Sequence, residues 1–370
     1  MLKSFSVENY KNFSDKLTLS FDSVRKYNFN NQYVKDGLLN KVLVVGKNAC
    51  GKTNLGYALF DIIYTLTDNY RHPLQVDGPS FLNGSTRKGY AEFVYEFADR
   101  GKTYEYTYRK TAPTVIIYES LKVDGETVFA RDGQEGDYGG LSGYNAGQLR
   151  IDLGDGSLSV LRFIVNNTLQ FEDSPLKYIV DFANGMLYFK SDQEGNMFMG
   201  LHKSPSPISG YIANNGLVTE FKKFLWDIAE IDIDLEAVCV GGMQNVLVQN
   251  LGNDKLVFDA IASSGIKMLL QFYYWFKQFE KVTFLFLDEF DAYFHYETAG
   301  KILKMVAEMG GFQTVFTSHN TTLIGNRILR PDCYMILEKG VLNNFSDCTN
   351  REIREGLNIE KMYRSGEFDE

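Results

Sequence analysis

Residues 41–53 read KVLVVGKNACGKT, and this stretch decides the fold. Residues 41–45 form a short β-branched run that predicts a strand, and from Thr53 onward apolar residues recur at helical spacing. Between strand and helix, the sequence matches G-x-x-x-x-G-K-[ST] at every fixed position. The predicted phosphate-binding loop consists of Gly46, Lys47, Asn48, Ala49, Cys50, Gly51, Lys52 and Thr53.

The residue types of this loop suit the phosphates of ATP. Glycines allow the backbone to curl until its N–H groups point at phosphate oxygens, and the helix that follows presents its positive N-terminal end. Lys52 is expected to neutralise the β- and γ-phosphates, and the Thr53 hydroxyl is expected to bind Mg²⁺. The alternative is a plain turn between a strand and a helix. The flanking strand and helix favour the phosphate loop, so ATP and Mg²⁺ are the predicted cofactors.

A second strand carries the acids that a phosphoryl-transfer site requires. Residues 284–289 read FLFLDE, a buried apolar strand that ends in two carboxylates. Asp288 is predicted to hold Mg²⁺ through water, and Glu289 to orient and polarise the attacking water. Without a phosphate loop elsewhere, the run would equally fit a strand that ends at a solvated acidic turn. Asp291 either contacts a second subunit across the nucleotide or caps a helix before Ala292.

A third strand end carries a histidine. Residues 316–320 read FTSHN, so His319 follows a predicted strand at the edge where α/β sheets bind ligands. His319 is predicted to donate a hydrogen bond to the γ-phosphate and to sense its presence, although an isolated histidine is more often structural.

The rest of the chain predicts further strands and helices around these motifs. Strands are expected at residues 2–7 and 17–21, and an antiparallel meander with strands at residues 90–97, 103–109, 114–120 and 121–129. Residues 131–157 are expected to form a loop, and residues 158–230 to be largely helical. Strands are then expected at 246–251, 255–258, 282–287, 313–317 and 333–337, and helices at 216–231, 264–279, 299–309 and 352–363. This pattern predicts three parts: an N-terminal lobe over residues 1–157, a mostly helical insertion over 158–236, and a C-terminal lobe over 237–370.

The order of phosphate loop, Asp-Glu strand and Ser-His strand resembles the ABC and SMC class of ATPase heads, which includes RecF-like and OLD-like proteins. The resemblance implies an α/β P-loop NTPase fold of the ABC-ATPase-head type, with a mixed sheet, an antiparallel β meander and a helical insertion. It also implies a glutamine loop, for which the candidates are Gln75 and Gln148.

The class carries a signature loop, usually Leu-Ser-Gly-Gly-Gln or a Ser-Ser-Gly variant, before the Asp-Glu strand. Residues 262–266 read ASSGI at the matching place, with Ala262 and Ile266 departing from the family's Leu and Gln. The resemblance implies that Ser263 and Gly265 reach the γ-phosphate of ATP bound to the other subunit. The alternative is that Ser263 or Ser264 is simply a helix N-cap.

The N-terminal segment also resembles these heads. Residues 5–13 read FSVENYKNF, similar to the opening of SMC-, RecF- and OLD-like heads, whose basic residue lies near the nucleotide. Lys11 therefore either touches phosphate or is a surface lysine at a strand turn.

Composition narrows the class of protein. The 370 residues are 44% hydrophobic and 23% charged, which is typical of a folded globular chain. The net charge of −9 counts against general binding of polyanions but leaves room for a local DNA-binding patch. Four scattered cysteines without a CxxC pair, no secretory signal and no membrane-spanning run predict a cytoplasmic protein without membrane contact.

Three functions fit these observations. OLD-like nucleases add a Toprim domain, for which the stretch after His319 is too short, so the chain resembles the stand-alone ATPases of bacterial anti-phage modules. This resemblance implies a homodimer or larger homo-oligomer that regulates a separate effector, either a nuclease or a toxin. The second function is a RecF-like ATPase of DNA repair or recombination that binds DNA directly. The third, the ATP-binding subunit of a transporter, fits the unusual signature least.

Overall fold

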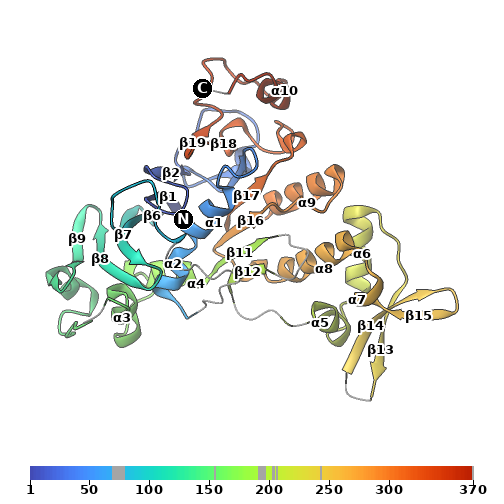
Figure 1. The fold of residues 1–370 in the computed structure, drawn as a ribbon, viewed down its shortest axis with the longest axis horizontal. Coiled ribbons are helices and arrows are strands. Elements are labelled where there is room, and N and C mark those ends of the chain that lie inside the picture. Colours follow the sequence, from blue (N-terminus) through green and yellow to red (C-terminus); the bar gives the residue numbers. More distant parts are fainter. Residues whose placement is uncertain are drawn as a thin grey trace.

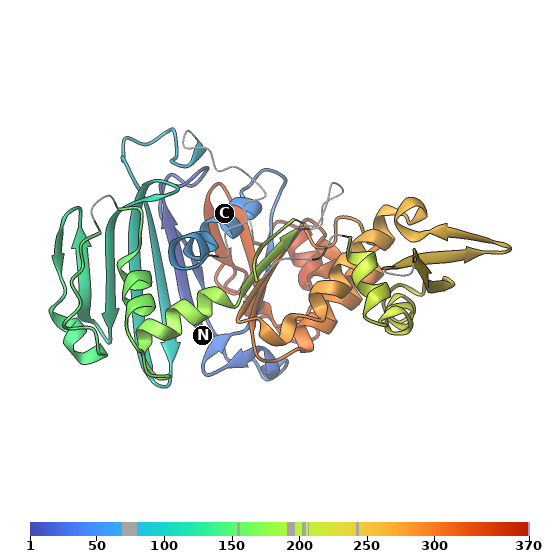
Figure 2. The same cartoon turned by 90° about the horizontal axis from the view of Figure 1, so that it is seen from below.

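The computed structural model describes residues 1–68, 80–153, 156–190, 197–201, 205, 207–241 and 244–368. Figure 1 shows a central sheet, a second large sheet formed mainly by the blue-to-green part of the chain, and a small sheet that protrudes at residues 235–257. Figure 2 shows the two large sheets side by side with helices between them.

The central sheet has seven strands in the order β12, β11, β16, β17, β5, β18, β19. Their bounds are β5 Lys41–Val45, β11 Met186–Lys190, β12 Met197–Gly200, β16 Phe284–Asp288, β17 Gln313–Ser318, β18 Tyr334–Glu338 and β19 Val341–Asn344. The five inner strands run parallel, and β12 and β19 pair antiparallel at the two edges. Every residue of β5 and β16 is buried, as expected for parallel strands covered on both faces. The carboxyl ends of β5, β16 and β17 therefore meet at one edge of the sheet.

The second sheet is antiparallel, with seven strands in the order β10, β9, β8, β7, β6, β1, β2. Their bounds are β1 Leu2–Glu8, β2 Leu17–Ser20, β6 Ala91–Asp99, β7 Lys102–Ala112, β8 Val115–Val123, β9 Glu126–Asp132 and β10 Glu135–Asp137. The predicted meander is confirmed, but the expected break between residues 120 and 121 is wrong. The chain turns instead at Asp124 and Gly125, whose φ angles of 50° and 85° suit an Asp-Gly hairpin turn.

Two short helices link the phosphate loop to the antiparallel sheet. They are α1 Lys52–Leu59 and α2 Asp61–Leu66, where the sequence predicts one continuous helix. At the break, the buried Tyr95 hydroxyl of β6 donates to the carbonyls of Ala58 and Leu59, at 3.2 and 3.1 Å. The last carbonyls of α1 thus find a partner outside the helix. Gly56 lets α1 pack close to the central sheet, because a Cβ there would lie 2.8 Å from the rings of Tyr188 and Phe286.

The middle of the chain combines helices with two strands of the central sheet. The helices are α3 Val160–Asn167, α4 Pro175–Asn184, α5 Ile208–Asn214 and α6 Val218–Ala229. The expectation that residues 158–230 are largely helical is wrong for β11, which pairs in parallel with β16, and for β12 beside it. A short apolar run such as residues 186–189 does not distinguish a strand from a buried helix by periodicity. The division of the chain after residues 157 and 236 stays a prediction.

The C-terminal part confirms most of the expected elements. The protruding sheet consists of β13 Leu235–Val240, β14 Gln244–Leu251 and β15 Asp254–Val257, and the helices are α7 Phe258–Ile261, α8 Ser264–Phe276, α9 Tyr296–Glu308 and α10 Ile359–Arg364. The last helix is shorter than the predicted 352–363 because Asn358 caps it, accepting a hydrogen bond from Lys361 N at 2.8 Å. Within the described ranges, no helix combines the length and apolar character needed to cross a membrane.

The remaining elements are short. They are η1 Asn31–Tyr33, β3 Val34–Lys35, β4 Leu38–Leu39, η3 Gly139–Tyr144, η4 Phe279–Lys281, η5 Thr321–Leu323 and η6 Pro331–Cys333. Residues 131–157, expected to form a loop, contain the end of β9, β10 and η3 and are otherwise irregular where described.

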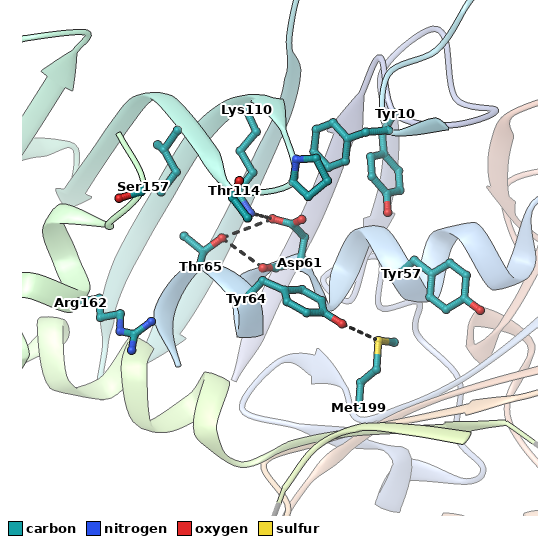
Figure 3. Close-up of a pocket in the computed structure, with 13 residues that line it drawn as sticks. Tyr10, Tyr57, Asp61, Tyr64, Thr65, Lys110, Thr114, Ser157, Arg162 and Met199 are labelled. Atoms are coloured by element: carbon teal, nitrogen blue, oxygen red, sulfur yellow. Dashed lines mark hydrogen bonds and ion pairs between the residues drawn. The ribbon is translucent and has the colours of Figure 1, made fainter. Parts of the chain in front are cut away.

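A buried ion pair joins α2 to β7 beside a cavity of about 350 Å³ (Figure 3). Lys110 contacts Asp61, and both side chains are almost fully buried. Asp61 also accepts a hydrogen bond from Tyr108 at 2.9 Å. Because a buried charge is costly without a partner, this pair holds α2 in one position against the antiparallel sheet. The cavity lies at the far end of α1 from the phosphate loop.

Lys41 is fully buried at the start of β5 and makes stability depend on pH. Its ammonium donates to the Phe312 carbonyl at 2.8 Å and to Thr314 Oγ1 at 3.2 Å. Burial lowers the pKa of Lys41 to about 7. An unfolded chain has an ordinary lysine pKa of about 10.4, so between pH 7 and that value the unfolded state binds more protons. The titration of Lys41 therefore makes the free energy of unfolding rise with pH between pH 7 and about pH 10.4.

We expect the difference in free energy of unfolding between wild type and a Lys41→Met variant to shift in favour of the wild type by about 2 kcal/mol between pH 7 and pH 9. Urea unfolding of both proteins at several pH values measures this difference, in which the other titrating groups cancel. A Lys47→Met variant is the control, because the Lys47 side chain is 88% exposed. Parallel pH profiles for wild type and Lys41→Met would show that Lys41 does not carry the dependence.

Candidate nucleotide site

The predicted phosphate loop connects β5 to α1 with a tightly curled backbone. Ala49 and Gly51 both have positive φ, at 62° and 111°. A Cβ on Gly46 would lie 2.5 Å from the carbonyl oxygen of Leu337, and one on Gly51 would lie 2.4 Å from the Asn12 side chain. The two glycines of the motif are thus required by close packing, and Lys47, Asn48 and Ala49 form the exposed crest of the loop.

Lys52 lies folded back into this loop with only 4% of its surface exposed. Its ammonium donates to the carbonyl oxygens of Gly46 and Lys47, at 2.9 and 3.2 Å. Burial lowers the pKa of Lys52, opposed by the nearby Cys50, Glu289 and Asp288. A cation held at the centre of a ring of backbone groups is suited to bind phosphate oxygens.

Thr53 and Asp288 meet across the site, as the sequence predicts. The Thr53 hydroxyl donates to Asp288 Oδ2 at 2.7 Å. Asp288 is fully buried and also accepts hydrogen bonds from Tyr188 at 2.9 Å and Thr317 at 2.7 Å. Three donors from three elements therefore fix the orientation of this carboxylate.

This donor set fits Mg²⁺ bound together with a nucleotide. Mg²⁺ usually takes one or two protein oxygens and completes its shell with water and phosphate oxygens. Thr53 and Asp288 supply one hydroxyl and one carboxylate that already lie 2.7 Å apart. Across the described ranges, no group of three or more His, Cys, Asp or Glu residues is placed to hold a metal ion unaided.

Glu289 follows Asp288 in a strained backbone conformation, with φ of 46°. Its backbone N–H donates to Thr317 Oγ1 at 2.8 Å. Oε2 lies 3.1 Å from Lys190 Nζ, and Oε1 lies 3.3 Å from His319 Nε2. Burial acts to raise the pKa of Glu289, but Lys190 and then His319 outweigh burial and lower it. The carboxylate is therefore kept ionised, as a general base must be.

His319 connects the acidic strand end to the phosphate loop. Its Nδ1 lies 2.9 Å from the Gly46 carbonyl oxygen and 3.1 Å from Lys52 Nζ. The structure thus brings Lys52, Thr53, Asp288, Glu289 and His319 together at the carboxyl ends of β5, β16 and β17, as the sequence predicts.

Asp291 does not cap a helix, so that alternative is wrong. No helix begins at Ala292, and α9 starts only at Tyr296. Asp291 instead accepts a hydrogen bond from Ser318 Oγ at 2.7 Å. Burial raises the pKa of Asp291, opposed by this hydrogen bond. Contact with a second subunit stays a prediction.

Ser263 and Gly265 lie at the start of α8, directly after α7. Ser263 is exposed, and its hydroxyl accepts a hydrogen bond from Ile266 N at 3.4 Å, so Ser263 caps α8. Gly265 packs beside the segment that follows Glu289, because a Cβ there would lie 3.4 Å from the Tyr293 carbonyl oxygen. The predicted contact with a nucleotide on another subunit stays a prediction.

Lys11 is half-buried rather than free on the surface, and its contact with phosphate stays a prediction. Its ammonium lies 5.7 and 5.9 Å from the ring centres of Tyr10 and Tyr57, and burial lowers its pKa. The next residue, Asn12, contacts the loop instead: it donates to the Cys50 carbonyl at 3.3 Å and accepts from Asn54 at 2.6 Å. Of the glutamine-loop candidates, Gln75 lies outside the described residues, and Gln148 is exposed in the segment after η3.

The sequence interpretation missed three residues that surround Asp288. They are Tyr188 and Lys190 on β11 and Thr317 on β17. Burial acts to lower the pKa of Lys190, but Asp288 and then Glu289 outweigh it and raise the pKa. The run MLYFK at residues 186–190, four apolar residues before a charge, is similar to the run before Asp288 and was the available signal.

The phosphate loop, the mixed sheet and the acidic end of β16 define an ATPase head of the ABC and SMC class. The chain belongs to the family described as "AAA domain, putative AbiEii toxin, Type IV TA system", whose model matches residues 42–325. This stretch runs from β5 to the segment after η5 and includes all five clustered residues. The match confirms the predicted resemblance and the predicted α/β P-loop fold.

Three solved structures of SMC heads resemble the chain. They are the SMC head domain from Thermotoga maritima (14% identity, TM-score 0.43, 92% of this chain and 97% of that one), an SmcHead bound to the C-winged helix domain of ScpA (15%, 0.43, 92% and 96%), and an Smc head domain with an extended coiled coil bound to the C-terminal domain of ScpA derived from Pyrococcus furiosus (13%, 0.44, 92% and 95%). The comparison with curated proteins gave no match.

Proposed function

We propose that this protein hydrolyses ATP with Mg²⁺ at a site that a second copy of the chain completes. The observation that supports this proposal is the cluster at three neighbouring strand ends. There, Thr53 bonds Asp288 at 2.7 Å, and His319 lies within 3.3 Å of both Lys52 and Glu289. Each of these groups matches a step of phosphoryl transfer to water.

The phosphate loop and its neighbours bind and orient the nucleotide. Backbone N–H groups of the curled loop and the Lys52 ammonium bind the phosphate oxygens, for which Lys52 exchanges its bonds to the Gly46 and Lys47 carbonyls. Thr53 and Asp288 would hold Mg²⁺, which neutralises charge on the β- and γ-phosphates. Tyr188 and Thr317 keep the Asp288 carboxylate in place.

Glu289 and His319 act on the water and the γ-phosphate. The ionised Glu289 carboxylate accepts a hydrogen bond from water and orients it for attack. His319, whose Nε2 faces Glu289 and whose Nδ1 faces the phosphate loop, links the base to the γ-phosphate position.

The start of α8 supplies the contact from the second copy. This helix has 13 residues, and its N-terminal end is exposed at Ser263. A helix N-terminus attracts anions, and Ser263 is not buried by its own chain, so this end is available for the γ-phosphate on another subunit. ATP would then act as the bridge of a homodimer or larger homo-oligomer.

The output of the ATPase is the control of a partner effector in anti-phage defence. The family description names a toxin and a toxin–antitoxin system, which supports this context. The protruding sheet and α7 carry exposed apolar side chains, which are typical of protein-binding surfaces. These side chains are Val240, Leu251, Leu256, Val257 and Ile261.

A mixing experiment tests whether the site is shared. Lys52→Ala removes the phosphate cation, and Ser263→Asp keeps an N-cap oxygen on α8 while placing a negative charge against the partner's γ-phosphate. We expect each variant alone to lack ATP hydrolysis. An equimolar mixture should recover about one quarter of the wild-type rate, because half of randomly mixed two-fold dimers pair the variants and each holds one complete site.

Phosphate release measures the rates, and a mixture of Lys52→Ala with Glu289→Gln is the control. Lys52 and Glu289 act in the same half of a site and come from the same subunit. In that mixture, every site therefore carries either Lys52→Ala or Glu289→Gln, so no recovery is expected. Normal hydrolysis by Ser263→Asp alone would restrict Ser263 to its capping role. Absence of hydrolysis by the wild-type protein under all conditions of Mg²⁺ and ATP would contradict the proposed function.

A further inference from the structure

Lys190 occupies a position at the nucleotide site that the predicted motifs do not assign. It is the last residue of β11, and the parallel pairing with β16 places it directly opposite Asp288. Its side chain is 22% exposed, and its ammonium lies 3.1 Å from Glu289 Oε2 and 3.6 Å from Asp288 Oδ2. A third oxygen, Thr53 Oγ1, lies 3.5 Å away.

These three oxygens are the ones that the proposed function requires for the metal and the water. A Mg²⁺ ion binds its oxygens at roughly 2.0–2.1 Å. An ion on Thr53 and Asp288 would therefore lie close to the ammonium in its present position, and two cations at such a distance repel strongly when partly shielded from water. Lys190 and the metal compete for the same oxygens.

We propose that Lys190 is an internal counter-ion that holds Asp288 and Glu289 until magnesium and nucleotide displace it. This inference rests on the proposed function and adds a regulatory step to the same site. While Lys190 binds Glu289, that carboxylate is not available to orient water. With Mg²⁺ and nucleotide bound, Lys190 would leave Asp288 and Glu289, and the freed Glu289 carboxylate would then orient water. Water activation would thus depend on correct loading of the site.

The surrounding hydrogen bonds allow Lys190 to move without loss of the fold. Asp288 keeps its bonds from Thr53, Tyr188 and Thr317 when the ammonium leaves. Glu289 keeps its backbone bond to Thr317 and its contact with His319. Lys190 is also the last residue of β11, and its side chain is 22% exposed.

Binding of Mn²⁺ in the absence of nucleotide tests this proposal. Electron paramagnetic resonance measures free Mn²⁺ in titrations of wild type, Lys190→Met and Lys223→Met. We expect Lys190→Met to bind Mn²⁺ at least about tenfold more tightly than wild type, because one positive charge near the ion is removed. Lys223→Met, which removes a charge from a side chain of α6 that is 74% exposed, should resemble wild type.

Two further variants locate and check the effect. Adding Asp288→Asn to Lys190→Met should abolish the gain in Mn²⁺ affinity, which places the ion at Asp288. Lys190→Gln keeps a polar side chain, removes the charge, and should reproduce the gain if Lys190→Met fails to fold.

The outcomes separate this inference from the proposed function. Equal Mn²⁺ affinity in wild type and both Lys190 variants would overturn the counter-ion role. Loss of ATP affinity in the Lys190 variants with unchanged Mn²⁺ binding would also overturn it, since Lys190 would then be a phosphate ligand. A gain in Mn²⁺ affinity in a protein that never hydrolyses ATP would support the counter-ion role and contradict the proposed function alone.

Discussion

Replacing Glu289 by glutamine is expected to slow ATP hydrolysis at least about 100-fold, the typical contribution of a general base. Glutamine keeps the size of the side chain and can still contact His319, but it lacks the ionised carboxylate that the contacts with Lys190 and His319 maintain in the wild type. The loop, Lys52, Thr53 and Asp288 are unchanged, so ATP binding persists. With binding intact and hydrolysis blocked, the ATP-bridged dimer should accumulate.

Light scattering of the Glu289→Gln protein with and without Mg²⁺-ATP measures its mass, and phosphate release measures its rate. Glu338→Gln is a suitable control, because Glu338 is a carboxylate at the end of the neighbouring strand β18. Among the described residues, its salt-bridge partner is the exposed Lys47. Hydrolysis at the wild-type rate by Glu289→Gln would disprove the assignment of the base. A constant mass with ATP demonstrably bound would mean that Ser263 serves only as a helix cap or that assembly requires another protein.

Replacing Lys52 by alanine is expected to weaken ATP binding by roughly 30-fold to several thousand-fold. Lys52 is 4% exposed, and among the described residues its ammonium contacts only groups of the loop and His319. The substitution therefore removes the buried cation of the phosphate loop. Loss of one partner from a buried, charged hydrogen-bond set costs about 2–5 kcal/mol. No other side chain of the loop replaces this charge.

Titration calorimetry or a fluorescent ATP analogue measures the affinity, and Lys47→Ala is the matched control. Lys47 belongs to the same loop, carries the same charge and is 88% exposed, so its removal should change ATP affinity by less than about threefold, as expected for an exposed charge. Equal losses in both variants would show that general positive charge, rather than the buried geometry of Lys52, binds the nucleotide.

The strand ends that carry the site were predictable because their signals are local. Residues 41–53 contain the strand, the loop and the helix start within one continuous stretch, and residues 284–289 contain a buried strand with its two acids. The break of α1 at Phe60 was not predictable, because it depends on the hydroxyl of Tyr95, which lies on a strand of the other sheet. The boundary between β8 and β9 was misplaced although the Asp-Gly turn at residues 124–125 marks it.

The sequence by itself determined the class of fold and five clustered residues: Lys52, Thr53, Asp288, Glu289 and His319. It did so because the phosphate loop and the acidic strand end each require particular residue types at fixed spacing. The tertiary structure alone decided that Tyr188 and Lys190 belong to the same site. These residues lie about 100 positions before Asp288, and only the parallel pairing of β11 with β16 brings them to it. Pairing between distant strands depends on burial and register across the whole sheet, which no local pattern encodes.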